Sequence, residues 1–205
     1  MFAGFETRRI VAPGDVGIHV RIGGAGPPVL LLHGYPQTHV CWHMVAPKLV
    51  AAGCTVVCPD LRGYGDSDKP ESNPDHRTYS KRAMALDHPQ TVRSIAVLDI
   101  APTETMYART DRRFATGYYH WFFLIQPAPL PERMIGADPE FYLRQKISAW
   151  NRTGMEVFAP EALAEYIRCF SDPAAIAASC EDYRAAATID LDHDAADAEA
   201  RITAP

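Results

Sequence analysis

Residues able to do chemistry follow, or lie within, the short apolar runs of this sequence. Residues 33–36 (His-Gly-Tyr-Pro) come directly after one such run, and Asp99 stands near the end of another. An aspartate at a strand end can orient a catalytic histidine, or it can cap the following turn. Farther along, His120, Trp121 and Tyr183 offer N–H and O–H groups that could bind an anion. The alternative is an aromatic core, because other aromatic side chains surround them, namely Tyr118, Tyr119, Phe122 and Phe123.

Three histidines near residue 40 raise the question of a metal site. His39 and His43 lie four residues apart and would share one face of a helix that begins there, and His33 precedes them. A structural or catalytic zinc needs at least three protein ligands, and no third ligand of suitable spacing accompanies the pair. The sequence therefore predicts no metal ion at this point, and it gives no sign of another cofactor.

Strands and turns are expected through the first hundred residues. Residues 5–12 and 16–22 predict a hairpin around Pro13-Gly14-Asp15, because apolar and polar side chains alternate along the second strand. The run Val29–Leu32 is apolar throughout, which is typical of a central parallel strand buried on both faces. A helix over residues 41–52, ended by Gly53, and a strand over 54–58 would complete a βαβ unit.

A third apolar strand is predicted over Ser94–Ile100, after a short helical tail at Leu86–Pro89. Beyond it the pattern becomes helical: residues 107–121 are rich in aromatic side chains, and prolines at 127, 129 and 131 interrupt them. Further helices are predicted over 139–150, 160–170 and 173–184. We expect an α/β fold with a core at 1–105, a helical cap at 106–190 and a return to the core beginning at 191–205.

Composition excludes several functional classes. The 205 residues carry a net charge of −5 and no Lys/Arg-rich run, which argues against a nucleic-acid-binding protein. The five cysteines form no CxxC pair, and we expect them to be reduced. No apolar stretch approaches the roughly 18 residues of a membrane span, and residues 1–9 do not resemble a signal peptide. A cytoplasmic location is therefore expected.

Three motifs together resemble one family. The His-Gly-Tyr-Pro loop at 33–36 is similar to the oxyanion-side loop of α/β-hydrolases, and residues 60–67 (Asp-Leu-Arg-Gly-Tyr-Gly-Asp-Ser) are similar to the turn after that fold's fourth strand. The set formed by residues 96–100 (Ala-Val-Leu-Asp-Ile), His120-Trp121 and residues 180–184 resembles haloacetate (fluoroacetate) dehalogenases in particular. The resemblance implies an α/β-hydrolase sheet with a helical cap subdomain.

The sequence departs from that family where the nucleophile belongs. No Gly-x-Ser/Asp/Cys-x-Gly elbow occurs. The nearest phrase, Gly63 to Ser67, belongs to the turn after the fourth strand, and Asp68-Lys69-Pro70 cannot open a helix after it. Residues 79–85 join 86–89 directly where the family has a strand, the elbow and flanking helices, an omission of about 35 residues at mean element lengths. The family's catalytic histidine would also follow the last residue, so we expect an incomplete sheet.

The resemblance implies hydrolysis of the carbon–halogen bond of small 2-haloacids through an ester intermediate, with water as co-substrate. It assigns Asp99 as the acid that orients the histidine, and it assigns five residues to the substrate or halide: His120, Trp121, Tyr183, Trp150 and Tyr35. No nucleophile is assigned. The family's substrate-binding arginines fall in the omitted segment, and the remaining Arg62, Arg82 and Arg184 do not take their place. A homodimer is a further expectation.

Two alternatives stay open. An epoxide hydrolase would share the fold, but its chemistry wants a pair of cap tyrosines, and the His120-Trp121 pair favours a halide. A truncated or internally deleted product without catalysis is the other alternative. Loss of a nucleophile costs about 10⁶ in turnover, and a missing central strand leaves two apolar edges unpaired. We therefore expect this chain to be inactive and poorly folded, although its family function is hydrolytic.

Overall fold

The computed structural model describes residues 1–81, 92–151, 153–197 and 199. These residues divide into two compact units. The first unit comprises Met1–Pro70 and Glu132–Ser179, and the second comprises Glu71–Pro131 and Cys180–Pro205. The sequence-based division into core, cap and return segment remains a prediction.

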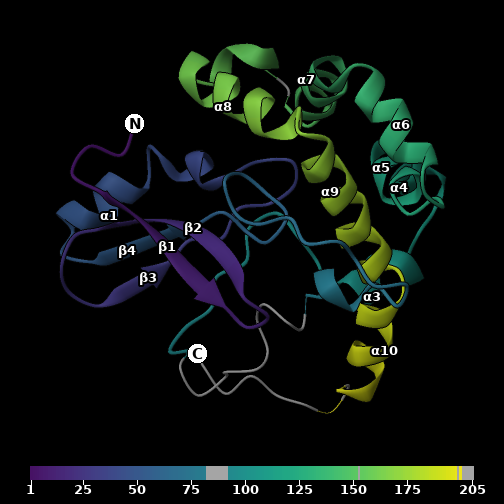
Figure 1. Cartoon of the computed structure of the whole chain (residues 1–205), viewed down its shortest axis with the longest axis horizontal. Helices are drawn as coiled ribbons and strands as arrows, with labels where there is room; N and C mark the ends of the chain where they lie inside the picture. Colours follow the sequence, from purple (N-terminus) through teal and green to yellow (C-terminus); the bar gives the residue numbers. More distant parts are fainter. Residues whose placement is uncertain (82–91, 152, 198, 200–205) are drawn as a thin grey trace. The chain divides into compact units, whose positions relative to one another are not determined.

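The first unit contains a four-stranded sheet (Figure 1). Its strands are β1 (Glu6–Ala12), β2 (Val16–Gly23), β4 (Thr55–Pro59) and β3 (Pro28–Leu30), in that spatial order. β1 pairs antiparallel with β2, and β4 pairs antiparallel with β2 and parallel with β3. The predicted hairpin is confirmed, and its turn uses the left-handed conformation at Gly14 and Asp15.

The core of this unit lies between the sheet and the segment that follows β3. Val56 and Cys58 of β4 are fully buried beside Ala46, and Phe2 completes the buried cluster. Partly buried side chains pack around it, including Leu31, Trp42, Leu49 and Val50. Alternate β4 residues therefore supply the inner face, as a two-residue period requires.

The prediction that Val29–Leu32 is a central strand buried on both faces is wrong for this structure. β3 is the last strand in the order and pairs with β4 alone among the described strands. Leu30 is 60% exposed and Leu32 43% exposed. The run has the composition of a central strand, but burial on both faces requires a second neighbouring strand, and the described residues provide none on that side.

The predicted strand over Ser94–Ile100 is also not formed. These residues adopt no regular structure and are exposed, among them Ile95, Val97, Leu98 and Ile100. A strand needs a neighbour to receive its backbone hydrogen bonds, so an apolar run without one does not become a strand. The predicted helical tail at Leu86–Pro89 and the junction between Ala85 and Leu86 lie outside the described residues.

Two short helices replace the single helix expected over residues 41–52. The 3-10 helix η1 spans His39–Trp42, and α1 spans Ala46–Ala51. Pro47 lies in the first turn of α1, where its missing N–H costs nothing, whereas a helix running through it from residue 41 would lose a hydrogen bond. The sequence pattern was therefore helical, but the proline decides where the helix starts.

The helices after residue 130 agree better with expectation. α7 (Pro139–Ala149), α8 (Pro160–Phe170) and α9 (Pro173–Ala186) were all predicted, and η4 covers Gly154–Val157. The sequence pattern does not predict α6 (Leu130–Ala137), because proline ordinarily interrupts a helix. Pro131 stands in the first turn of α6, a position that favours proline.

In the second unit the aromatic stretch forms three short helices instead of one. They are α3 (Thr103–Ala108), α4 (Arg112–Gly117) and α5 (His120–Phe123). Asp111 begins α4 by accepting a hydrogen bond from the Phe114 N–H at 2.7 Å, so the chain restarts a helix there. The unit also contains η2 (Arg77–Tyr79) and α10 (Ile189–Ala196). None of the described helices is both long enough and apolar enough to span a bilayer.

Candidate functional site

The structure brings together three side chains predicted to bind halide. His120 and Trp121 lie on α5 and Tyr183 lies on α9, all within the second unit. The Tyr183 ring centroid is 5.5 Å from that of His120 and 5.8 Å from that of Trp121, both in edge-on orientations. His120 is only 1% exposed, and Trp121 is buried. A buried imidazole and a buried indole thus meet a partly buried phenol, and each of these groups is able to donate a hydrogen bond.

Arg184 holds α9 against the segment that follows α5. Its Nε and one Nη donate to the carbonyl oxygen of Gln126 at 3.1 and 2.6 Å. Its other Nη donates to Glu181 at 2.6 Å, and the side chain is buried. Because Tyr183 is the preceding residue, this anchor determines the position of the phenol relative to α5.

Glu181 extends the anchor to His76. The His76 Nδ1 lies 2.7 Å from a Glu181 oxygen, which joins the segment before η2 to α9. Burial alone would raise the pKa of Glu181, but hydrogen bonds from Ser72, His76 and Arg184 hold that pKa below its usual value. Glu181 is therefore ionised under ordinary conditions and pairs with Arg184.

Aromatic side chains form the other wall of this cluster. Tyr107 of α3 packs edge-on against Trp121 with ring centroids 5.4 Å apart, and Phe114 of α4 lies 6.2 Å from Trp121. Burial raises the pKa of Tyr107 to about 12, so its phenol keeps its proton. His120, Trp121 and Tyr183 are therefore part of an aromatic core. Their N–H and O–H groups could still bind an anion at the edge of that core.

Asp99 does not have the setting that the sequence predicted. The expected strand is not formed, so Asp99 does not stand at a strand end; it is exposed and has a φ of +56°. A non-glycine residue in that region is uncommon, although aspartate tolerates it better than most. The role of Asp99 as the orienting acid remains a prediction.

Tyr35 lies in the loop after β3, in the first unit. Its hydroxyl donates to the Tyr142 hydroxyl of α7 at 3.2 Å, and its ring packs edge-on against Phe170 of α8 at 6.1 Å. The preceding His33 is buried, and its Nε2 accepts a hydrogen bond from the Leu61 N–H at 3.0 Å. The two family motifs, the loop at 33–36 and the turn at 60–67, are therefore joined through His33.

Trp150, the other predicted pocket residue, lies just after α7 in the same unit. It is exposed and lines a cavity of about 240 Å³ with Gln37, Ile147, Asn151 and Phe158. The ammonium group of Lys146 lies 4.8 Å from the centre of its ring, a cation–π arrangement. Burial lowers the pKa of Lys146 to about 8. The sequence had not singled out Lys146, since a lysine one turn away from a tryptophan is an ordinary helix pattern.

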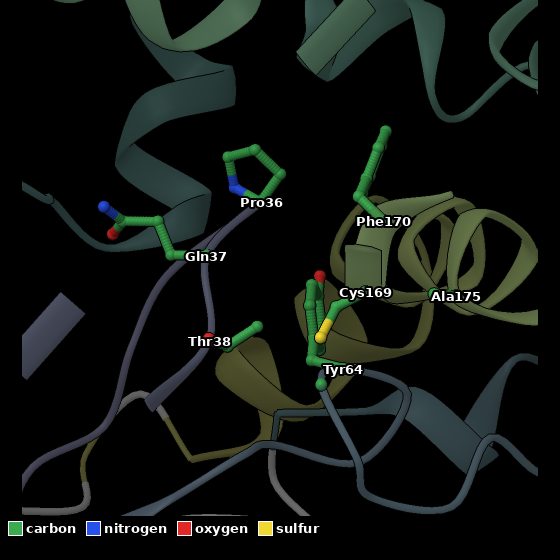
Figure 2. Close-up of a pocket in the computed structure, with 8 residues that line it drawn as sticks. Pro36, Gln37, Thr38, Tyr64, Cys169, Phe170 and Ala175 are labelled. Atoms are coloured by element: carbon green, nitrogen blue, oxygen red, sulfur yellow. The ribbon is translucent and has the colours of Figure 1, made fainter. Parts of the chain in front are cut away.

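A second, smaller cavity lies between the loop after β3 and the end of α8 (Figure 2). Pro36, Gln37 and Thr38 face Cys169 and Phe170 across it, and Tyr64 also lines it. Its volume of about 10 Å³ suits roughly one water molecule and no substrate.

Sequence reasoning also missed a buried polar cluster in the second unit. The Ser80 hydroxyl donates to Asp190 at 2.6 Å, and the His193 Nδ1 lies 3.4 Å from the Ser80 oxygen. His193 lies on α10 and is partly buried. In a nucleophilic triad the histidine stands between serine and aspartate, whereas here serine donates directly to aspartate. The hydrogen bond to Asp190 connects Ser80 to α10. The spacing of these residues in the sequence does not predict this cluster.

Comparison with known proteins indicates the fold and the family of the chain. A family model described as the alpha/beta hydrolase fold matches residues 27–82. A fluoroacetate dehalogenase from Burkholderia sp is 47% identical, and the alignment covers 100% of this chain and 77% of the relative. That alignment runs over 236 positions whereas this chain has 205 residues, so at least 31 positions face a gap in this chain. A soluble epoxide hydrolase from Corynebacterium sp. (strain C12) is 30% identical over 81% of this chain and 68% of its own length.

Solved structures share the fold. ALR0039 from Nostoc sp PCC 7120, assigned to the α/β-hydrolases, superposes with a TM-score of 0.96 at 50% identity over 100% of this chain and 80% of that chain. A Pseudomonas aeruginosa protein assigned as an epoxide hydrolase has a TM-score of 0.88 at 38% identity, covering 98% of this chain and 77% of its own. On the motifs, the fold and these relatives, the chain belongs to the haloacetate dehalogenase-like family of α/β-hydrolases.

Proposed function

We propose that this chain carries the halide-binding part of a site that hydrolyses the carbon–halogen bond of small 2-haloacids. The packing of the partly buried Tyr183 against the buried His120 and Trp121 supports this most directly. The relative named a fluoroacetate dehalogenase supports the same substrate class. Water is the co-substrate, and the reaction needs no cofactor.

In the proposed reaction an enzyme carboxylate attacks the carbon that bears the halogen. A carbon–oxygen bond forms, and the halide leaves with the electron pair of the broken bond. Water then attacks the carbonyl carbon of the ester, a histidine accepts its proton, and a 2-hydroxyacid is released while the carboxylate is regenerated. Asp99 is proposed to orient that histidine, and Tyr35 and Trp150 are proposed to contact the substrate.

Departure of the halide is the step that His120, Trp121 and Tyr183 would assist. Fluoride leaves poorly, so donors that act on developing negative charge favour the transition state over the bound haloacid. Each hydrogen bond to a charged group contributes about 1.5–3 kcal/mol. Burial strengthens these bonds, because little water competes for the anion.

We further propose that this chain by itself does not turn over. It has no Gly-x-Ser/Asp/Cys-x-Gly elbow, and at least 31 alignment positions of the dehalogenase face a gap here. We place that gap at the junction of Ala85 and Leu86. The exposed apolar run at 95–100 supports the same conclusion, and so does the exposed edge of β3, because each has the composition of a strand that a neighbouring strand covers.

Two measurements on the purified full chain test these statements. The first is halide release from fluoroacetate and chloroacetate; we expect none above background, and clear turnover would refute the inactive assignment. The second is bromide binding, followed by tryptophan fluorescence, with Trp121→Phe used to identify the responding indole.

Tyr183→Phe removes one hydroxyl and should weaken bromide binding about tenfold or more, which corresponds to one charged hydrogen bond. Tyr118→Phe is the matched control, because Tyr118 stacks on Phe114 at the edge of the same cluster. Equal bromide affinity in the wild type and Tyr183→Phe would contradict the halide-binding assignment.

Epoxide hydrolysis is the second candidate. Tyr107 and Tyr183 both pack on Trp121, at 5.4 and 5.8 Å, and a pair of tyrosines is what epoxide opening requires. A change in tryptophan fluorescence on adding an epoxide, without a change on adding bromide, would favour epoxide hydrolysis. The homodimer and the cytoplasmic location remain predictions, which sedimentation and fractionation of host cells would check.

A further inference from the structure

Three side chains from distant parts of the sequence meet on one side of the first unit. His19 lies on β2, His39 lies on η1, and Asp60 directly follows β4. Each offers one ligand atom, and these atoms all lie within 4.8 Å of one another. None of the three belongs to the proposed halide site.

Backbone hydrogen bonds hold His19, His39 and Asp60 in these positions. The Asp60 N–H donates to the His19 carbonyl oxygen at 2.9 Å, which continues the pairing of β2 with β4 by one residue. Thr38 caps η1 by accepting from the Val40 N–H at 3.3 Å, which fixes the start of the helix that carries His39. The three side chains are therefore held by regular structure.

The Asp60 carboxylate is oriented by backbone donors. One oxygen accepts from the His39 N–H at 2.7 Å and lies 2.8 Å from the His39 Nδ1, while the other accepts from the Asp66 N–H at 3.0 Å. Gly65 makes room for it, because a Cβ there would lie 2.1 Å from the carboxylate. Asp60 is 0% exposed, so its orientation is well defined.

His19 forms the more accessible side of the group. Its ring centroid is 5.0 Å from that of His39 at an angle of 41°, and the residue is only partly buried. Its backbone N–H donates to the Ser67 hydroxyl at 2.8 Å, so the strand is held independently of the ring. The ring can therefore rotate without disturbing β2.

Two imidazoles and one carboxylate are a ligand set that divalent transition metals accept. Zinc binds such nitrogen and oxygen atoms at about 2.0–2.2 Å, which places any two of them at most about 4 Å apart. The observed spread of up to 4.8 Å thus needs a shift of less than about 1 Å, which the partly exposed His19 ring can supply.

We propose that His19, His39 and Asp60 form a binding site for a divalent transition metal ion, Zn²⁺ in the first instance, with water completing the tetrahedron. The ion would connect β2, η1 and the turn after β4, and its role would be structural. The site is independent of the proposed dehalogenase chemistry. Sequence spacing could not indicate it, since the three residues are 20 and 21 positions apart.

The test uses the purified full chain without a histidine tag, freed of metal with a chelator. Calorimetric titration with Zn²⁺ should show one equivalent bound, and Co²⁺ should produce the visible absorption of a tetrahedral site. His19→Gln should weaken Zn²⁺ binding by more than about tenfold, because loss of an outer partner alone costs 10–100-fold. His43→Gln is the matched control and should bind like the wild type, because its ring Nδ1 lies 2.8 Å from the Val40 carbonyl oxygen and it does not belong to the group of His19, His39 and Asp60.

Circular dichroism of each variant confirms that the fold is kept. If His19→Gln binds one equivalent as tightly as the wild type, or if the wild type binds none, the proposal is wrong. X-ray absorption of the Zn²⁺-loaded wild type gives a second measurement that needs no variant. Two imidazole ligands are expected, and a spectrum without imidazole would overturn the assignment.

Discussion

Asp60 is the residue whose replacement most directly tests how the first unit is held together. The substitution Asp60→Asn keeps the size of the side chain and changes only its hydrogen-bonding capacity. Three donors now point at the carboxylate, namely the His39 N–H, the His39 ring and the Asp66 N–H. An amide accepts through one oxygen, so its NH₂ group would face a donor that has no other acceptor.

The expected cost follows from these contacts. A hydrogen bond to a charged group contributes about 1.5–3 kcal/mol, and a buried donor left without an acceptor costs about 1–3 kcal/mol. Because the Asp60 carboxylate itself is 0% exposed, little water reaches the donors that face it. We expect Asp60→Asn to lower the free energy of unfolding by roughly 2–4 kcal/mol, which shifts a urea midpoint by about 1–2 M for a slope near 2 kcal/mol/M.

The assay is urea unfolding followed by tryptophan fluorescence and circular dichroism, with a chelator present throughout. Asp66→Asn is the control, because it lies in the same turn and its carboxylate accepts from Arg168 at 2.8 Å across an exposed contact. Exposed ion pairs contribute about 0–1 kcal/mol, so its midpoint should barely move. Equal midpoints for the two variants would refute the reasoning.

Two further predictions concern the edge of β3 and α9. Leu32→Lys should reduce self-association without lowering stability, because Leu32 is exposed beside an edge of β3 that no other described strand covers, and a charge there discourages edge-to-edge pairing. Sedimentation velocity measures the association, and an unchanged value would exclude that edge. Glu181→Gln should flatten the loss of stability as the pH falls below about 4.5, the ordinary pKa of a glutamate. The folded-state pKa of Glu181 is lowered, so its contribution is present above the unfolded-state pKa and is lost as the pH falls through the folded-state value; identical pH profiles of stability in variant and wild type would contradict it.

Local patterns determined much of this protein from sequence alone. Alternation and a Pro-Gly-Asp turn predict the β1–β2 hairpin, and the local pattern over 139–150, 160–170 and 173–184 predicts α7, α8 and α9. The motif at 33–36, the turn at 60–67 and the aromatic residues His120, Trp121 and Tyr183 were enough to indicate the family. These turns, helices and motifs depend on residues that are close in the sequence, so the sequence alone can predict them.

Only the tertiary structure decided what depends on distant partners. Val29–Leu32 and Ser94–Ile100 have the composition of buried strands, yet one lies at an edge and the other forms no strand. The meeting of His19, His39 and Asp60, and the bond of Ser80 to Asp190, likewise have no signature in spacing. A strand or a polar cluster exists only where another segment supplies its hydrogen bonds, and apolar composition alone cannot provide that partner.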